Sequence, residues 1–62
     1  MASTIFVKNE NGREIDFDAA VALMDDDIRE QIHNENPNLT PQEFYDEYVT
    51  RHYEEFDEWF TI

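Results

Sequence analysis

The chain has 62 residues, of which 16 are acidic and 4 are basic, and its formal net charge at pH 7 is -12. This charge opposes direct contact with nucleic acids and anionic membrane surfaces, because both are densely negative. A chain of this length forms one small domain, residues 1–62, which buries only about 60% of its unfolded surface. It contains no cysteine and no apolar run that could span a bilayer, so we expect a cytoplasmic protein without disulfides or thiolate metal sites.

The aromatic residues favour a folded domain over a disordered chain. High net charge with modest hydrophobicity is typical of intrinsic disorder. However, the sequence contains five Phe, three Tyr and one Trp, and these residues recur at regular spacings. Aromatic side chains bury large apolar areas, so this content can stabilise a small core.

An antiparallel hairpin is predicted at the N-terminal end. Residues Thr4–Lys8 are rich in β-branched and aromatic types, and Glu14–Phe17 alternates polar and apolar residues, as strands do. Between them, Asn11 and Gly12 supply the two positions that tolerate positive φ in a tight hairpin turn. Because an isolated hairpin is unstable in water, we expect a helix to cover one of its faces.

A first helix is expected from about Asp18 to His33. Its apolar residues recur at steps of three and four, which places them on one face of an α-helix. These residues are Phe17, Val21, Met24, Ile28 and Ile32. Asp16 or Asp18 can cap its start, because a short carboxylate accepts hydrogen bonds from the first free amides. Pro37 prevents the helix from continuing through the linker.

A second helix begins with a capping box, in which Thr40 is the N-cap, Pro41 the first helical residue and Glu43 the third. Beyond it, apolar and aromatic residues continue at helical spacing almost to the C-terminus. These positions are Phe44, Tyr45, Tyr48, Val49, His52, Tyr53, Phe56, Trp59 and Phe60. They exceed the width of one helix face, so Trp59, Phe60 and Tyr45 are candidates for partial exposure at an interface.

Together these elements predict an α+β fold in which an N-terminal β-hairpin is followed by two packed α-helices. A mostly helical fold is the alternative, because a short strand can be absorbed into an unstructured N-terminus. Charge repulsion disfavours self-association, so we expect a monomer or a weak dimer.

The sequence lacks the parts that catalysis, cofactor binding or metal binding requires. It has no Cys nucleophile, no nucleophile elbow and only one glycine, Gly12, so it cannot form a glycine-rich phosphate loop. The spacing of an EF-hand fails when counted from Asp16, and the acidic run Asp25–Asp27 cannot converge on one ion within a helix, because adjacent side chains point about 100° apart. His33 and His52 lie on different predicted helices and lack zinc-ligand spacing. We therefore predict that the protein is not an enzyme and holds no metal or cofactor.

The acidic residues form the most informative pattern. Seven carboxylates lie between residues 43 and 58, which on a helix gives one negative charge per roughly 4 Å of axis. A DNA strand carries one phosphate per roughly 3.4 Å. Their mutual repulsion destabilises a small domain, which favours a role in binding a basic groove; an acidic surface for solubility is the alternative. The candidate partner-binding residues are Asp25, Asp26, Asp27, Glu30, Glu43, Asp46, Glu47, Glu54, Glu55, Asp57, Glu58 and Trp59.

Two segments, Ile15–Glu30 and Pro41–Tyr48, resemble small acidic proteins encoded by phages and mobile elements of bacteria. The chain is similar in character to proteins of the anti-CRISPR and anti-restriction type, several of which act as DNA mimics. This resemblance implies an inhibitor that works in the host bacterial cell by occupying the nucleic-acid-binding site of a defence complex. The implied partner is a basic nucleic-acid-binding protein, such as a CRISPR effector complex or a restriction enzyme.

Two functions therefore remain open at this point. An inhibitor that acts by acidic DNA mimicry would lose affinity steeply as salt increases. A protein-interaction module that docks through exposed aromatic residues such as Trp59 and Phe60 would show weak salt dependence and depend on the indole. The response to salt and the effects of substituting acidic or aromatic residues distinguish the two.

Overall fold

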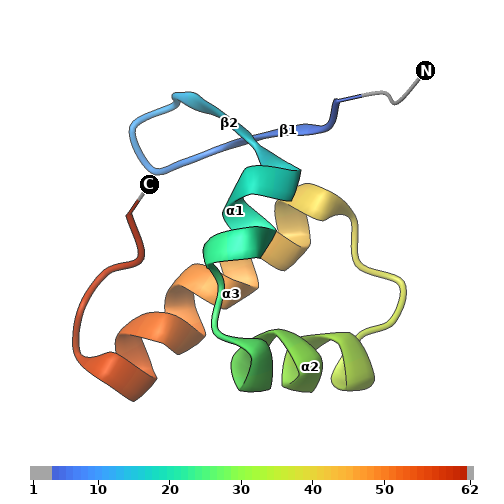
Figure 1. Cartoon of the computed structure of the whole chain (residues 1–62), viewed down its shortest axis with the longest axis vertical. Helices are drawn as coiled ribbons and strands as arrows, with labels where there is room; N and C mark the ends of the chain where they lie inside the picture. Colours follow the sequence, from blue (N-terminus) through green and yellow to red (C-terminus); the bar gives the residue numbers. More distant parts are fainter. Residues whose placement is uncertain (1–3, 62) are drawn as a thin grey trace.

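The structure, a computed structural model, describes residues 4–61, in which a two-stranded antiparallel sheet precedes three helices. The elements in order are β1 (Phe6–Lys8), β2 (Glu14–Asp16), α1 (Phe17–Leu23), α2 (Asp26–Glu35) and α3 (Pro41–Phe56). The hairpin and α2 lie at opposite ends of the molecule, with α1 and α3 between them (Figure 1). The predicted α+β class is confirmed, but the described residues form three helices after the hairpin and not two.

The hairpin pairs Val7 with Ile15, and both side chains are buried against the helices. Asn9 organises the connecting loop, because its Oδ1 accepts hydrogen bonds from the backbone N–H groups of Asn11 and Arg13, at 3.0 and 2.9 Å. Within this connecting loop, residues 9–13, only Gly12 has a positive φ, at 78°. The tight turn with positive φ at both Asn11 and Gly12 is therefore wrong, and a longer loop closed by the Asn9 side chain replaces it.

The single helix expected over residues 18–33 is also wrong, because the chain breaks at Met24 and Asp25. Met24 adopts an extended conformation that ends α1, and the Asp25 carboxylate then caps α2 by accepting a 3.2 Å hydrogen bond from the Ile28 N–H. Met24, Ile28 and Ile32 are all buried, so the apolar spacing continues across the break. Periodicity alone could not reveal the change of direction.

Side-chain caps fix the starts of α1 and α3 as expected. Asp16 caps α1, its Oδ1 accepting a 2.9 Å hydrogen bond from the Asp18 N–H, so the first of the two candidate caps is used. Thr40 and Glu43 form the reciprocal capping box, with Pro41 as the first residue of α3. The hydrogen bonds at both boundaries join residues two or three positions apart, which explains why the pattern predicts them.

The end of α3 differs from expectation. The helix stops at Phe56, and Asp57 adopts the left-handed conformation with φ of 56°. Glu58, Trp59 and Phe60 therefore lie on a separate segment that returns beside α3 toward the hairpin (Figure 1). The proposed line of seven carboxylates along one helix is correspondingly shorter than the sequence suggested.

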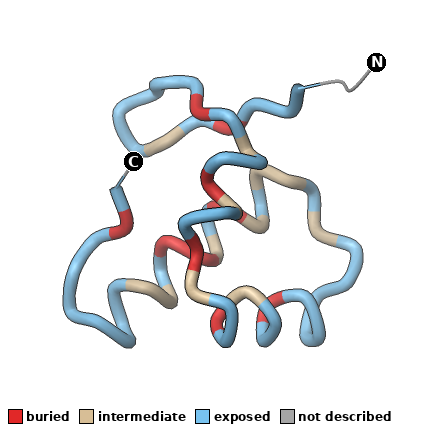
Figure 2. The backbone as a smooth tube through the Cα atoms, in the orientation of Figure 1, coloured by how far each residue is buried: buried red, intermediate tan, exposed pale blue. Residues whose placement is uncertain are grey.

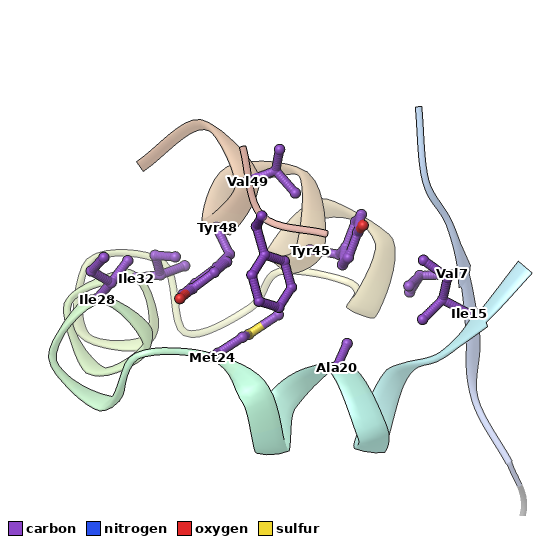
Figure 3. Close-up of a cluster of buried hydrophobic side chains, with 10 residues drawn as sticks. Val7, Ile15, Ala20, Met24, Ile28, Ile32, Tyr45, Tyr48 and Val49 are labelled. Carbon is purple, nitrogen blue, oxygen red and sulfur yellow. The ribbon is translucent and has the colours of Figure 1, made fainter. Parts of the chain in front are cut away.

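The core forms where the hairpin and all three helices meet the returning C-terminal segment (Figure 2). Met24 and the two isoleucines of α2 lie around Tyr48, while Val7 and Ile15 approach Tyr45 (Figure 3). The buried residues are Val7, Ile15, Ala20, Met24, Ile28, Ile32, Tyr45, Tyr48, Val49 and Phe60.

Tyr48 joins this core to the break between α1 and α2. Its side chain is fully buried, and its hydroxyl oxygen accepts a 2.7 Å hydrogen bond from the backbone N–H of Asp25. Burial raises the pKa of Tyr48, so the phenol stays protonated at neutral pH. The hydroxyl thus holds the first turn of α2 against the middle of α3.

Replacing Tyr48 with Phe is expected to lower the free energy of unfolding by about 1–3 kcal/mol, because the Asp25 N–H loses its acceptor in a partly buried position. Urea unfolding followed by circular dichroism measures the change. Tyr53→Phe is the matched control, since the Tyr53 side chain is exposed. Equal effects of the two substitutions would contradict the role assigned to the Tyr48 hydroxyl.

Candidate acidic interface

A groove of about 600 Å³ between α2 and α3 gathers acidic residues from both helices. Five carboxylates line it, those of Asp25, Asp27, Glu47, Glu54 and Glu55. The remaining lining residues are Ile28, Gln31, Arg51 and Phe56. We call this feature the acidic groove. It brings together five of the twelve residues that the sequence proposed for partner binding.

Helical spacing and the break at Asp25 together build the acidic groove. Glu47, Arg51 and Glu54 are separated by four and then three residues, so they share one face of α3. The break allows α2 to start beside the C-terminal half of α3, which brings Asp27 to the same groove. The acidic run 25–27 is thus a helix cap and first turn, where the helix dipole favours negative charge.

Arg51, the one basic residue of the acidic groove, is engaged within the protein. Its Nη1 and Nη2 donate hydrogen bonds of 3.0 and 2.8 Å to the two carboxylate oxygens of Glu35, and its Nε donates one of 2.9 Å to Glu47. These hydrogen bonds raise the pKa of Arg51 above its ordinary value. Among residues 4–61, by contrast, Glu54 and Glu55 make no ion pair. Their charges remain available to a partner.

The C-terminal end of α3 holds carboxylates where helix electrostatics oppose them. The last carbonyls of a helix carry negative partial charge and favour cations. Glu54 and Glu55 nevertheless occupy the last turn of α3, a fully described turn that contains no basic residue. Asp57 follows in a left-handed conformation, which a short polar residue such as Asp adopts more readily than most other residues. Helix stability therefore does not explain this cluster, which favours a function for it.

The other acidic residues that the sequence singled out lie on different surfaces. Glu43 and Asp46 line a second groove, which Glu47 joins to the first. Asp26 and Glu30 lie on the other flank of α2, beside an apolar groove of about 750 Å³. The twelve candidate residues are thus divided among several surfaces.

Of the three aromatic candidates, only Trp59 is exposed. Its exposed fraction is 52%, whereas Tyr45 and Phe60 are buried at 3% and 8%. The expectation of exposure was wrong for Phe60 because the turn at Asp57 directs this ring into the core, 4.8 Å from the Tyr48 ring centroid. Trp59 instead stacks on Tyr53, a residue of the aromatic stripe that was expected to lie in the core.

Arg51, which organises the acidic groove, was not among the residues predicted from the sequence. The spacing of Glu47 and Arg51, four residues apart on a predicted helix, is a recognisable signal for an ion pair. The contact with Glu35 is sixteen positions distant and depends on how α2 packs against α3. No local pattern reveals it.

The Arg51–Glu35 contact predicts a specific response to acid. Hydrogen bonding to Arg51, and then its positive charge, lower the pKa of Glu35 from 4.5. A carboxylate with a lowered pKa stabilises the folded state above pH 4.5, the ordinary pKa of the group. This stabilisation is lost as the pH falls through the pKa that the carboxylate has in the folded protein. We therefore expect Glu35→Gln to lower the free energy of unfolding at pH 7. In acid, the free energies of unfolding of the variant and the native protein should become equal.

Urea unfolding at several pH values on both sides of 4.5 tests this expectation. Glu30→Gln is the control, since Glu30 makes no ion pair within the described part of the chain and its loss changes the net charge equally. If Glu35→Gln lowered the free energy of unfolding by the same amount at every pH, the stabilising role of the Arg51–Glu35 ion pair would be contradicted.

The two histidines occupy unrelated positions. His52 is partly buried and packs against Tyr48 and Phe56, as a packing residue would, and His33 lies exposed in the last turn of α2. Over residues 4–61, no three His, Asp or Glu side chains are arranged to hold a metal ion. No helix in that range combines the length and apolarity needed to cross a membrane.

Comparison with known proteins identifies the family. A family model described as anti-CRISPR protein AcrIC5 matches residues 8–60, which include both helices of the acidic groove and the segment that carries Trp59. No curated protein matches the chain. The match covers most of the 62 residues and confirms the resemblance to anti-CRISPR proteins. The chain therefore belongs to the family of anti-CRISPR protein AcrIC5, and it is an anti-CRISPR inhibitor.

Proposed function

We propose that the protein inhibits a CRISPR effector complex by placing its acidic groove on the basic surface with which that complex binds nucleic acid. The observation that carries this proposal is the composition of the groove: five carboxylates with one guanidinium, which Glu35 and Glu47 already neutralise. Lysine and arginine side chains that normally contact phosphates pair with Asp27, Glu54 and Glu55 instead.

The remaining acidic residues act at longer range. Asp26, Glu30, Glu43 and Asp46 lie outside the acidic groove and add to a negative field that accelerates the approach to a basic surface. Asp57, Glu58 and Trp59 extend the contact surface at the C-terminal end of α3. The inhibitor acts in the host bacterial cell, as a monomer or weak dimer, and binds neither nucleic acid nor membranes itself.

Docking through aromatic residues is the second candidate function. The exposure of Trp59 favours it, but Phe60, the other residue proposed for this role, is buried in the core. An aromatic contact therefore supplements the acidic groove in this proposal and does not replace it.

Binding of the tagged protein to a purified effector complex tests the proposal. The affinity should fall at least about tenfold between roughly 50 and 500 mM NaCl, and duplex DNA should compete with the inhibitor for the complex. An affinity that does not respond to salt, or a ternary complex containing both DNA and inhibitor, would contradict mimicry.

A further inference from the structure

A stacked aromatic pair lies exposed at the C-terminal end of α3. The ring centroids of Tyr53 and Trp59 are 4.2 Å apart, and the planes of the rings differ by 27°. Exposed fractions of 40% for Tyr53 and 52% for Trp59 show that the pair presents an aromatic surface to solvent.

The position of the Trp59 indole is fixed from both sides. Asp57 turns the chain through its left-handed conformation, and the next residue after Trp59, Phe60, is buried against Tyr48 and His52. An aromatic side chain held in this way loses little conformational freedom when a partner binds. The pair is therefore a preorganised contact surface.

The charges near this pair select the kind of group that it can bind. Glu54 and Glu55 follow Tyr53 on α3, and Asp57 and Glu58 precede Trp59; all four are exposed. A guanidinium group is planar, stacks on aromatic faces and forms forked hydrogen bonds with carboxylates. A lysine ammonium group is more strongly hydrated and lacks the forked geometry.

We propose that the Tyr53–Trp59 pair and the carboxylates of the adjoining turn form a docking point for an arginine side chain of the basic partner. The inference rests on the proposed function for the existence of a basic partner, and it specifies the chemistry of one contact. The acidic groove supplies attraction to any cation, whereas the aromatic pair discriminates arginine from lysine.

Titration calorimetry with hexa-arginine and hexa-lysine peptides at low salt tests this docking point without the effector complex. We expect the native protein to bind hexa-arginine about three- to fivefold more tightly than hexa-lysine. Trp59→Leu, which keeps an apolar side chain but removes the aromatic face, should lose most of this preference. Phe6→Ala is the control, because Phe6 is an equally exposed aromatic residue on β1, and it should retain the preference.

Three results would overturn the inference: no measurable binding of hexa-arginine, no preference in the native protein, or a full preference in Trp59→Leu. Circular dichroism confirms that each variant is folded. Failure of the proposed function is separate, because it appears as salt-insensitive binding of the effector complex and leaves the peptide titration unchanged.

Discussion

Reversing two charges in the acidic groove, through Glu54→Lys together with Glu55→Lys, is expected to abolish inhibition of the effector complex while leaving the protein folded. Both side chains are exposed and unpaired within residues 4–61, and both line the groove. Each substitution replaces attraction to a basic surface with repulsion, and we expect a loss of affinity of about 100-fold or more. Lysine in the last turn of a helix also interacts favourably with the dipole, so stability should not fall.

The matched control is Glu10→Lys together with Glu14→Lys. These residues are exposed on the hairpin, at the opposite end of the molecule from α2, and their reversal changes the net charge by the same amount. Affinity for the purified complex and thermal unfolding are measured for both double variants. Equal losses of affinity would show that overall charge matters and the groove does not. Unchanged affinity in the groove variant would contradict the proposed interface.

Capping residues were the part of the fold that the sequence predicted best. Thr40, Pro41 and Glu43 act within one turn, and their hydrogen bonds need no contact from elsewhere in the chain. The break at Asp25 was missed although a short carboxylate at this position can also cap a helix. The backbone N–H of Asp25 donates a hydrogen bond to the hydroxyl oxygen of Tyr48, which lies 23 positions away in the sequence. No local sequence pattern reveals a contact over that distance.

The candidate interface likewise depends partly on local sequence patterns and partly on contacts between residues far apart in the sequence. Composition revealed a strongly acidic protein, and the spacing of Glu47, Glu54 and Glu55 placed carboxylates on a helix. The groove lies where α2 packs against α3, and its one basic residue, Arg51, is neutralised by Glu35 and Glu47. Those contacts depend on the angle between helices, which sequence periodicity does not determine.

Replacing Phe60 with Ala is expected to cause a large loss of stability. The ring is 8% exposed and packs against Tyr45, Tyr48 and His52, so its removal leaves a cavity in the core. Loss of a buried Phe costs about 3–5 kcal/mol. A domain of 62 residues has a total stability of about 3–9 kcal/mol, so a substantial fraction of the variant should be unfolded at 37 °C.

Trp59→Ala provides the control, since it removes the neighbouring aromatic side chain, which is 52% exposed. The substitution removes the stacking on Tyr53 but opens no cavity. We therefore expect the free energy of unfolding to change by at most about 1 kcal/mol. Urea unfolding followed by far-UV circular dichroism compares the two variants with the native protein. A larger effect for Trp59 than for Phe60 would mean that the C-terminal segment faces the other way, with the indole in the core and out of reach of an arginine side chain.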